Sequence, residues 1–147
     1  MRGPSTMDRA VLDVVQQQLA VYGDVADMRH IWGDSAEMWF VEVQPVNFRA
    51  APMSLAFDGQ DLLNVNVGAT WFEVFPFRED SLNWLRGIVR AVLAGRVEEA
   101  RTWGDAFARL HTEAGTMRVG HVHWPLPWRW RPVRRYESYG DRVTSGQ

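Results

Sequence analysis

Residues 53–95 constrain the fold more than any other part of the chain, because a meander of short strands there runs straight into an amphipathic helix. A first strand at 54–57 ends at Asp58-Gly59, a pair that tolerates the positive φ angles of a tight hairpin turn. Over residues 63–67, leucine and valine alternate with asparagine, which is typical of a strand with one apolar and one polar face. An aromatic run at 71–75 is ended by a proline. These patterns predict three antiparallel strands.

The helix after the meander is predicted over residues 81–94. Its apolar residues recur at i, i+3, i+4 and i+7 spacing, and Asp80 or Ser81 can cap its first N–H groups. Gly95 suits the C′ position just beyond its end. The apolar side of this helix is therefore expected to cover one face of the meander.

A helix and a hairpin are predicted before the meander. The helix covers about residues 7–22, with Ser5 or Thr6 as its cap and a glycine as its stop. The hairpin joins strands at 27–32 and 37–43, and the second strand carries apolar side chains on both faces, which favours a central place in the sheet. The connection at 46–52 is expected on the surface, with Phe48 tucked inward.

The part of the chain after the second helix leaves alternatives open. Residues 98–111 are compatible with a hairpin on a Gly-Asp turn and with a helix, because Ala, Glu, Arg and Leu all favour helix. A strand is the better prediction for 117–123, where valines follow a turn glycine. The proline-rich residues 124–139 are predicted to be extended and to wrap across the body of the protein.

Length and composition place the chain among folded globular proteins. With 147 residues, 46% hydrophobic and 23% charged, we predict a single α+β domain over residues 1–147, with flexible ends at 1–5 and 140–147. It should contain a mainly antiparallel sheet of five to seven strands with two helices packed on it. The absence of cysteine excludes disulfides and thiolate zinc sites, and no apolar run suits a secretory signal or a membrane span. A cytoplasmic location is expected.

The Arg/Trp segment, residues 124–135, is the first candidate site. It concentrates residue types that are enriched in binding hot spots, namely Trp124, Trp128, Arg129, Trp130, Arg131, Arg134 and Arg135. The alternative is an edge strand that packs its tryptophans on the body and leaves its arginines in solvent. A net charge of −2 argues against nucleic acid as the partner.

Three further groups of residues carry side chains that could form a site. His121 and His123 lie on the same side of a predicted strand, close enough to share a metal ion, although a third ligand is not specified by the spacing. Asp58 and Asp61 are better explained by turn chemistry than by calcium binding. The pair at 98–99 is predicted to consist of solvated glutamates or partners of an arginine.

The order of the elements, the Phe-Asp-Gly turn at 57–59 and the closing Tyr-Glu-Ser-Tyr at 136–139 resemble an uncharacterised family of small α+β proteins from high-GC bacteria, to which no activity is assigned. Some compact α+β proteins of this appearance are immunity proteins that neutralise toxins, an implication that rests on analogy of fold. The resemblance transfers no catalytic residue.

We therefore expect a non-catalytic protein-interaction protein, immunity-type or regulatory, in which the Arg/Trp segment contacts the acidic surface of a partner protein. A homodimer is compatible with this reading, and no cofactor and no membrane contact are predicted. One alternative is an enzyme or a small-ligand or metal carrier that uses a concave sheet face with His121 and His123. Another is binding of single-stranded nucleic acid. No nucleophile elbow, Walker loop, dinucleotide fingerprint or HExxH motif is present.

Overall fold

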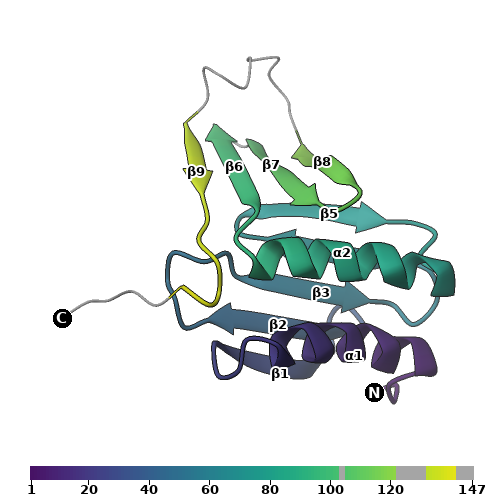
Figure 1. Cartoon of the computed structure of the whole chain (residues 1–147). Helices are drawn as coiled ribbons and strands as arrows, with labels where there is room; N and C mark the ends of the chain where they lie inside the picture. The colour runs from purple at the N-terminus through teal and green to yellow at the C-terminus, as the bar shows by residue number, and fades with distance from the viewer. Residues whose placement is uncertain (103–104, 122–131, 142–147) are drawn as a thin grey trace.

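The computed structural model describes residues 1–102, 105–121 and 132–141, which form two helices and two antiparallel sheets (Figure 1). The helices are α1 (Thr6–Ala20) and α2 (Leu82–Leu93), and a 3₁₀ turn, η1 (Glu79–Ser81), leads into α2. The five-stranded sheet has the order β1-β2-β3-β4-β5, with β1 (Ala26–Gly33), β2 (Met38–Pro45), β3 (Met53–Phe57), β4 (Leu63–Val67) and β5 (Thr70–Val74). The four-stranded sheet has the order β8-β7-β6-β9, with β6 (Val97–Thr102), β7 (Asp105–Thr112), β8 (Gly115–His121) and β9 (Val133–Arg135).

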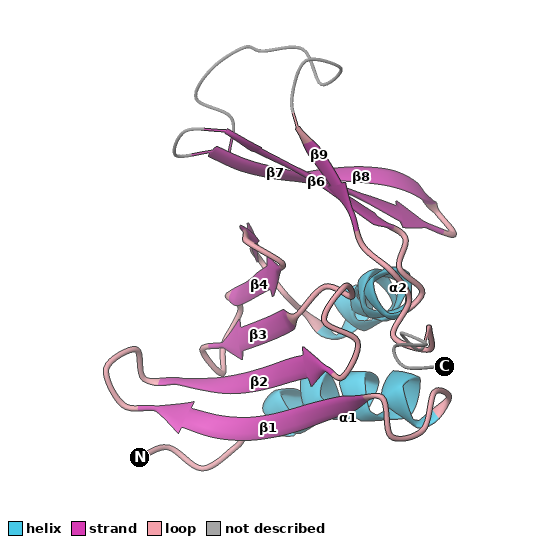
Figure 2. Ribbon diagram, turned by 90° about the vertical axis from the view of Figure 1, so that its left-hand side faces the viewer, coloured by secondary structure: helices cyan, strands magenta, loops and turns pink. Residues whose placement is uncertain are grey.

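The predicted α+β class, the antiparallel pairing and the two helices are confirmed. The strands divide between two sheets, whereas one sheet of five to seven strands was expected. Both helices cover the same face of the five-stranded sheet and leave its other face open, and the four-stranded sheet stands beyond β5 (Figure 2). This arrangement separates a buried layer from an open sheet face.

The core lies between the five-stranded sheet and the two helices. Along β2, β3 and β4, Val41, Leu55 and Val65 stand opposite one another and are buried under the helices. The apolar side of α2 meets them, as its periodicity predicts, with Leu85 and Ile88 fully buried. Helix α1 begins with a capping box, in which the Ser5 hydroxyl accepts from the Asp8 backbone N–H while the Asp8 carboxylate accepts from the Ser5 N–H.

The segment with two open interpretations, residues 98–111, forms the β6–β7 hairpin and no helix. Val97 and Leu110 stand opposite each other and are both buried in the core, next to α2. Burial of this apolar pair on one face therefore outweighs the helix propensity of the alanines, glutamates and arginines around it. The strand predicted at 117–123 corresponds to β8, which begins two residues earlier.

The C-terminal residues 132–141 do cross the body of the protein. Strand β9 pairs with β6, and the residues after it bond to segments that are far away in the sequence. The prediction for the 46–52 connection is wrong in part, because Ala50 and Ala51 are buried and Phe48, expected to point inward, is 67% exposed. Its neighbour Asn47 is buried instead, since its side-chain amide donates to the backbone oxygen of Ser138 at 3.2 Å.

Candidate binding face of the five-stranded sheet

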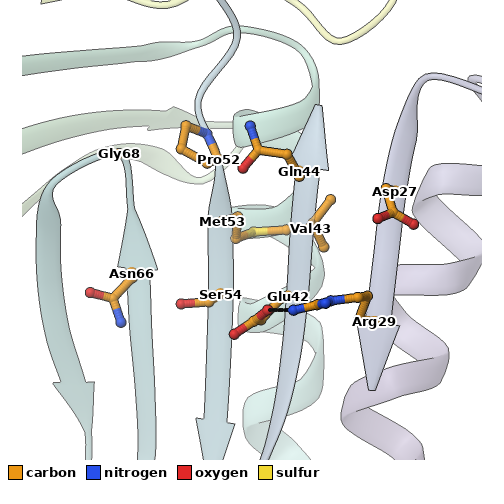
Figure 3. A pocket seen from close by; sticks show the side chains of 10 residues that line it. All are labelled: Asp27, Arg29, Glu42, Val43, Gln44, Pro52, Met53, Ser54, Asn66 and Gly68. Atoms are coloured by element: carbon orange, nitrogen blue, oxygen red, sulfur yellow. Dashed lines mark hydrogen bonds and ion pairs between the residues drawn. The ribbon is translucent and has the colours of Figure 1, made fainter. Parts of the chain in front are cut away.

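The open face of the five-stranded sheet carries one continuous row of polar and aromatic side chains. The strand register places five residues opposite one another in the order Arg29, Glu42, Ser54, Asn66 and Trp71. Since successive side chains of a strand point to opposite faces, this row lies on the side that the helices leave open. Figure 3 looks onto this face, with the helices behind the strands.

The alternating sequence of β4 explains how the row arises. Its leucine and valines are buried beneath the helices, so the asparagines between them, Asn64 and Asn66, are directed to the open face. Gly68 then adopts a φ of +61° in the turn to β5, which brings Trp71 opposite Asn66. The periodicity predicted the two faces, but the partner of each asparagine depends on the pairing of all five strands.

A groove of about 390 Å³ hollows this face. Its polar lining comes from strands β1 to β4, with Asp27, Arg29, Glu42, Gln44, Ser54 and Asn66 (Figure 3). The lining therefore combines carboxylate and amide acceptors with guanidinium, amide and hydroxyl donors. Such a surface is suited to a polar partner that presents both donors and acceptors.

One ion pair in the groove is accessible to solvent. The Arg29 guanidinium contacts the Glu42 carboxylate, with Nη2 and Oε2 3.2 Å apart, and the two side chains are 63% and 45% exposed. Exposed pairs of this kind contribute little to stability, because water and salt screen them. Both groups can therefore exchange their mutual contact for a partner's charges at small cost.

The Arg/Trp segment is described only in part. Trp124, Trp128, Arg129, Trp130 and Arg131 lie outside the described residues, whereas Arg134 and Arg135 are exposed in β9. Nε of Arg135 donates to Glu98 at 3.3 Å, and the Arg134 guanidinium lies 4.8 Å from the centroid of the Tyr136 ring.

The proposed histidine pair stays a prediction. His121 is the last residue of β8, opposite Ala106, and His123 lies outside the described residues. Within residues 1–102, 105–121 and 132–141, no three His, Asp or Glu side chains gather where they could hold a metal ion. The turn prediction for Asp58 is confirmed, because its Oδ1 accepts the backbone N–H groups of residues 60, 61 and 62.

The two neighbouring glutamates, 98 and 99, have opposite environments. Glu98 fits the expectation of an arginine partner, and hydrogen bonding from His111, at 2.7 Å, is the main reason why its pKa lies below the ordinary value. For Glu99 the prediction of a solvated side chain is wrong, since it is only 1% exposed. The strand alternation could have predicted this burial, because Glu99 lies two residues after the buried Val97 and therefore on the same face of β6.

The Glu99 carboxylate is satisfied by three hydrogen bonds inside the protein. Oε2 accepts from the Thr70 hydroxyl at 2.6 Å and from the Ala69 backbone N–H at 2.9 Å. Oε1 accepts from the Tyr136 hydroxyl at 2.8 Å. The carboxylate thus joins β5 of one sheet, β6 of the other and the C-terminal segment, which makes it a structural connection.

Comparison with protein-family models, with curated proteins and with solved structures finds no match to this chain. Among the described residues, no helix is long and apolar enough to cross a membrane. Any function must therefore be argued from the surfaces described above.

Proposed function

We propose that this protein is a non-catalytic protein-interaction protein, and that its partner docks on the open face of the five-stranded sheet. The observation that carries the proposal is the row from Arg29 to Trp71, which crosses all five strands on the face that the two helices leave open. Arginine and tryptophan are among the residues most enriched in binding hot spots. The row has an arginine, Arg29, at one end and a tryptophan, Trp71, at the other.

The width of the row favours a macromolecular partner over a small ligand. Neighbouring strands lie about 4.8 Å apart, so Arg29 and Trp71 are separated by about 19 Å across the sheet. A single small molecule in the groove would reach only part of this distance. A protein surface can contact both ends, and Trp71, with 45% of its surface exposed, offers the apolar anchor that such interfaces use.

A second candidate surface is the edge formed by β9. All three residues of this strand are exposed, and two of them are arginines, Arg134 and Arg135. Their charge supports the expectation that an acidic partner protein contacts the Arg/Trp segment. An immunity-type or regulatory role is compatible with either surface, because both roles require the recognition of another protein.

Affinity capture from a lysate of the source cells can separate the two surfaces. We would compare the wild type with a face variant, Arg29→Ala with Trp71→Ala, and with an edge variant, Arg134→Ala with Arg135→Ala. A control variant on α1 and just beyond its end, Arg9→Ala with Val21→Ala, removes one arginine and one apolar residue, both exposed. Circular dichroism would first verify that all four proteins are folded.

The proposal expects one protein that the wild type, edge variant and control variant enrich and that the face variant loses. Calorimetry with that partner should show a loss of affinity of at least about 30-fold for the face variant, the size expected of a hot spot. Loss with the edge variant alone would transfer the role to β9. Equal capture by all four proteins would overturn both candidates.

A further inference from the structure

Helix α2 contains a glycine that the fold does not require. Gly87 lies in the middle of the helix, where glycine is the least favourable residue apart from proline. Its φ is not in the left-handed region, and a Cβ atom built on it would meet no atom within 4 Å. Neither backbone conformation nor close packing therefore explains the missing side chain.

The missing side chain opens a groove of about 300 Å³ between α2 and the turn that joins β7 to β8. Gly87 contributes to its lining from the helix, Trp84 and Arg86 line it from the preceding turn, and Met117 lines it from β8. In Figure 1 the β7–β8 turn lies above α2. The volume is at the lower end of the range of small-molecule sites.

The aromatic wall of this groove is held in place and remains accessible. The Trp84 ring packs edge-on against Phe72, with ring centroids 6.4 Å apart and an interplanar angle of 90°. The side chain is still 36% exposed. A fixed and accessible indole is a good surface for stacking a planar ring.

The two arginines of the groove differ in their partners. Arg90 forms an ion pair with Glu113, at 3.0 Å. Arg86 donates to the neutral side chain of Asn83, at 2.6 Å, and has no acidic partner among the described residues. The groove therefore carries one guanidinium whose charge is not balanced, and its planar fork suits a carboxylate or a phosphate.

We propose that this groove binds a small planar aromatic anion, with the ring stacked on Trp84 in the space over Gly87 and the anionic group on the Arg86 guanidinium. The site lies on α2, and the helices cover the opposite side of the sheet from the proposed docking face. It is thus a small-molecule site in addition to the proposed interaction surface.

Saturation-transfer NMR on the full chain can test the proposal with named probes. Indole-3-carboxylate presents a fused ring with a carboxylate, and adenosine monophosphate presents one with a phosphate. Indole-3-carboxamide and adenosine are their neutral counterparts. We expect at least one of the two anions to bind with a Kd below about 1 mM and its neutral counterpart to bind at least about tenfold more weakly. Which anion binds identifies the acidic group.

Three variants connect binding to the groove. Gly87→Leu should abolish binding while leaving the melting temperature equal to or above that of the wild type, because leucine favours helix and the space is empty. Arg86→Gln should remove the preference for the anion over its neutral counterpart. Trp84→Leu should weaken the binding of the anion and of its neutral counterpart. Arg9→Gln, an exposed arginine on α1, should change neither.

Two results would overturn the proposal. The first is no saturation transfer from the protein to either anion at about 1 mM of the anion. The second is wild-type affinity in a folded Gly87→Leu protein, because a ligand in the groove cannot share the space with the new side chain. The melting temperature of Gly87→Leu, measured in parallel, distinguishes a blocked groove from a failure to fold.

Discussion

The hydroxyl of Tyr136 donates a hydrogen bond of 2.8 Å to Oε1 of Glu99, and both side chains are buried, with 7% and 1% of their surface exposed. Tyr136 follows β9 directly, whereas Glu99 belongs to β6. This bond therefore fastens the C-terminal segment over a carboxylate that also binds β5.

Tyr136→Phe should destabilise the protein by about 1–3 kcal/mol, because it leaves a buried carboxylate oxygen without its donor. Urea unfolding at neutral pH measures the change. Tyr22→Phe is the matched control, since the Tyr22 hydroxyl makes no hydrogen bond to the described residues. An equal effect of the two substitutions would show that the Tyr136–Glu99 bond adds nothing to stability.

The same bond predicts a change of stability at alkaline pH. Burial, together with the hydrogen bond to Glu99 and its charge, raises the pKa of Tyr136 to about 12. An unfolded tyrosine titrates near pH 10, so the folded state holds the proton more tightly and loses stability as the pH rises from about 10 to 12. The wild type should lose more of its unfolding free energy over this interval than Tyr136→Phe. Parallel stability curves for the two proteins would contradict the raised pKa.

Gly68→Ala should lower the free energy of unfolding by about 2–4 kcal/mol, more than the same substitution at a turn glycine with free space around it. Gly68 has a φ of +61°, and a Cβ atom there would clash with the Tyr136 hydroxyl. Gly23→Ala is the control, because Gly23 has a φ of +79° with nothing within 4 Å, so only the backbone strain of about 1 kcal/mol is expected. Denaturant midpoints of the two variants compare the costs directly, and equal costs would argue against crowding at Tyr136.

Asp8 should make the stability of the protein depend on pH in the acidic range. Burial acts to raise the pKa of Asp8, but hydrogen bonds from Arg2 and Ser5 outweigh it, and the pKa lies below its ordinary value. A lowered pKa stabilises the fold above about pH 4 and ceases to do so as the carboxylate is protonated. Asp8→Asn should therefore lose about 1–2 kcal/mol at pH 7 and progressively less below about pH 4.

Urea unfolding at pH 7 and near pH 3 provides the comparison for Asp8. The control is Asp13→Asn, because Asp13 lies on the same helix and is exposed. A deficit of Asp8→Asn that stays the same at both values of pH would indicate that the hydrogen bonds of Asp8 do not depend on its charge.

The sequence predicted those helices and strands whose formation depends mainly on neighbouring residues in the chain. The helix at α2 was predicted to within a residue of each end, because its periodicity and the stop at Gly95 agree. The predicted side-chain cap is not formed by Ser81, whose hydroxyl accepts the backbone N–H of Arg78 instead. The β6–β7 hairpin was only one of two interpretations, because its alanines and arginines favour helix and the burial of Val97 and Leu110 decides against it.

The candidate site could not be predicted in the same way. Arg29 and Trp71 lie at opposite ends of one row only because four strand pairings are in register, and no single segment specifies four registers. The most conspicuous residues in the sequence are the tryptophans at 124–130, and their pattern did not indicate the open sheet face as a site. Gly87 was visible in the sequence, but its meaning depends on the empty space above it.

The position of Tyr136 has a consequence for the order in which the protein is synthesised. Tyr136 follows Glu99 by 37 residues, and its backbone N–H also donates to Val97. Translation adds about 5–20 residues per second, so about 2–7 s pass between the synthesis of the acid and that of its phenol donor. During that interval the nascent chain already contains both helices and all of the five-stranded sheet. The ribosome therefore supplies Tyr136 only after strands β5 and β6, which its hydroxyl joins through Glu99, have been synthesised.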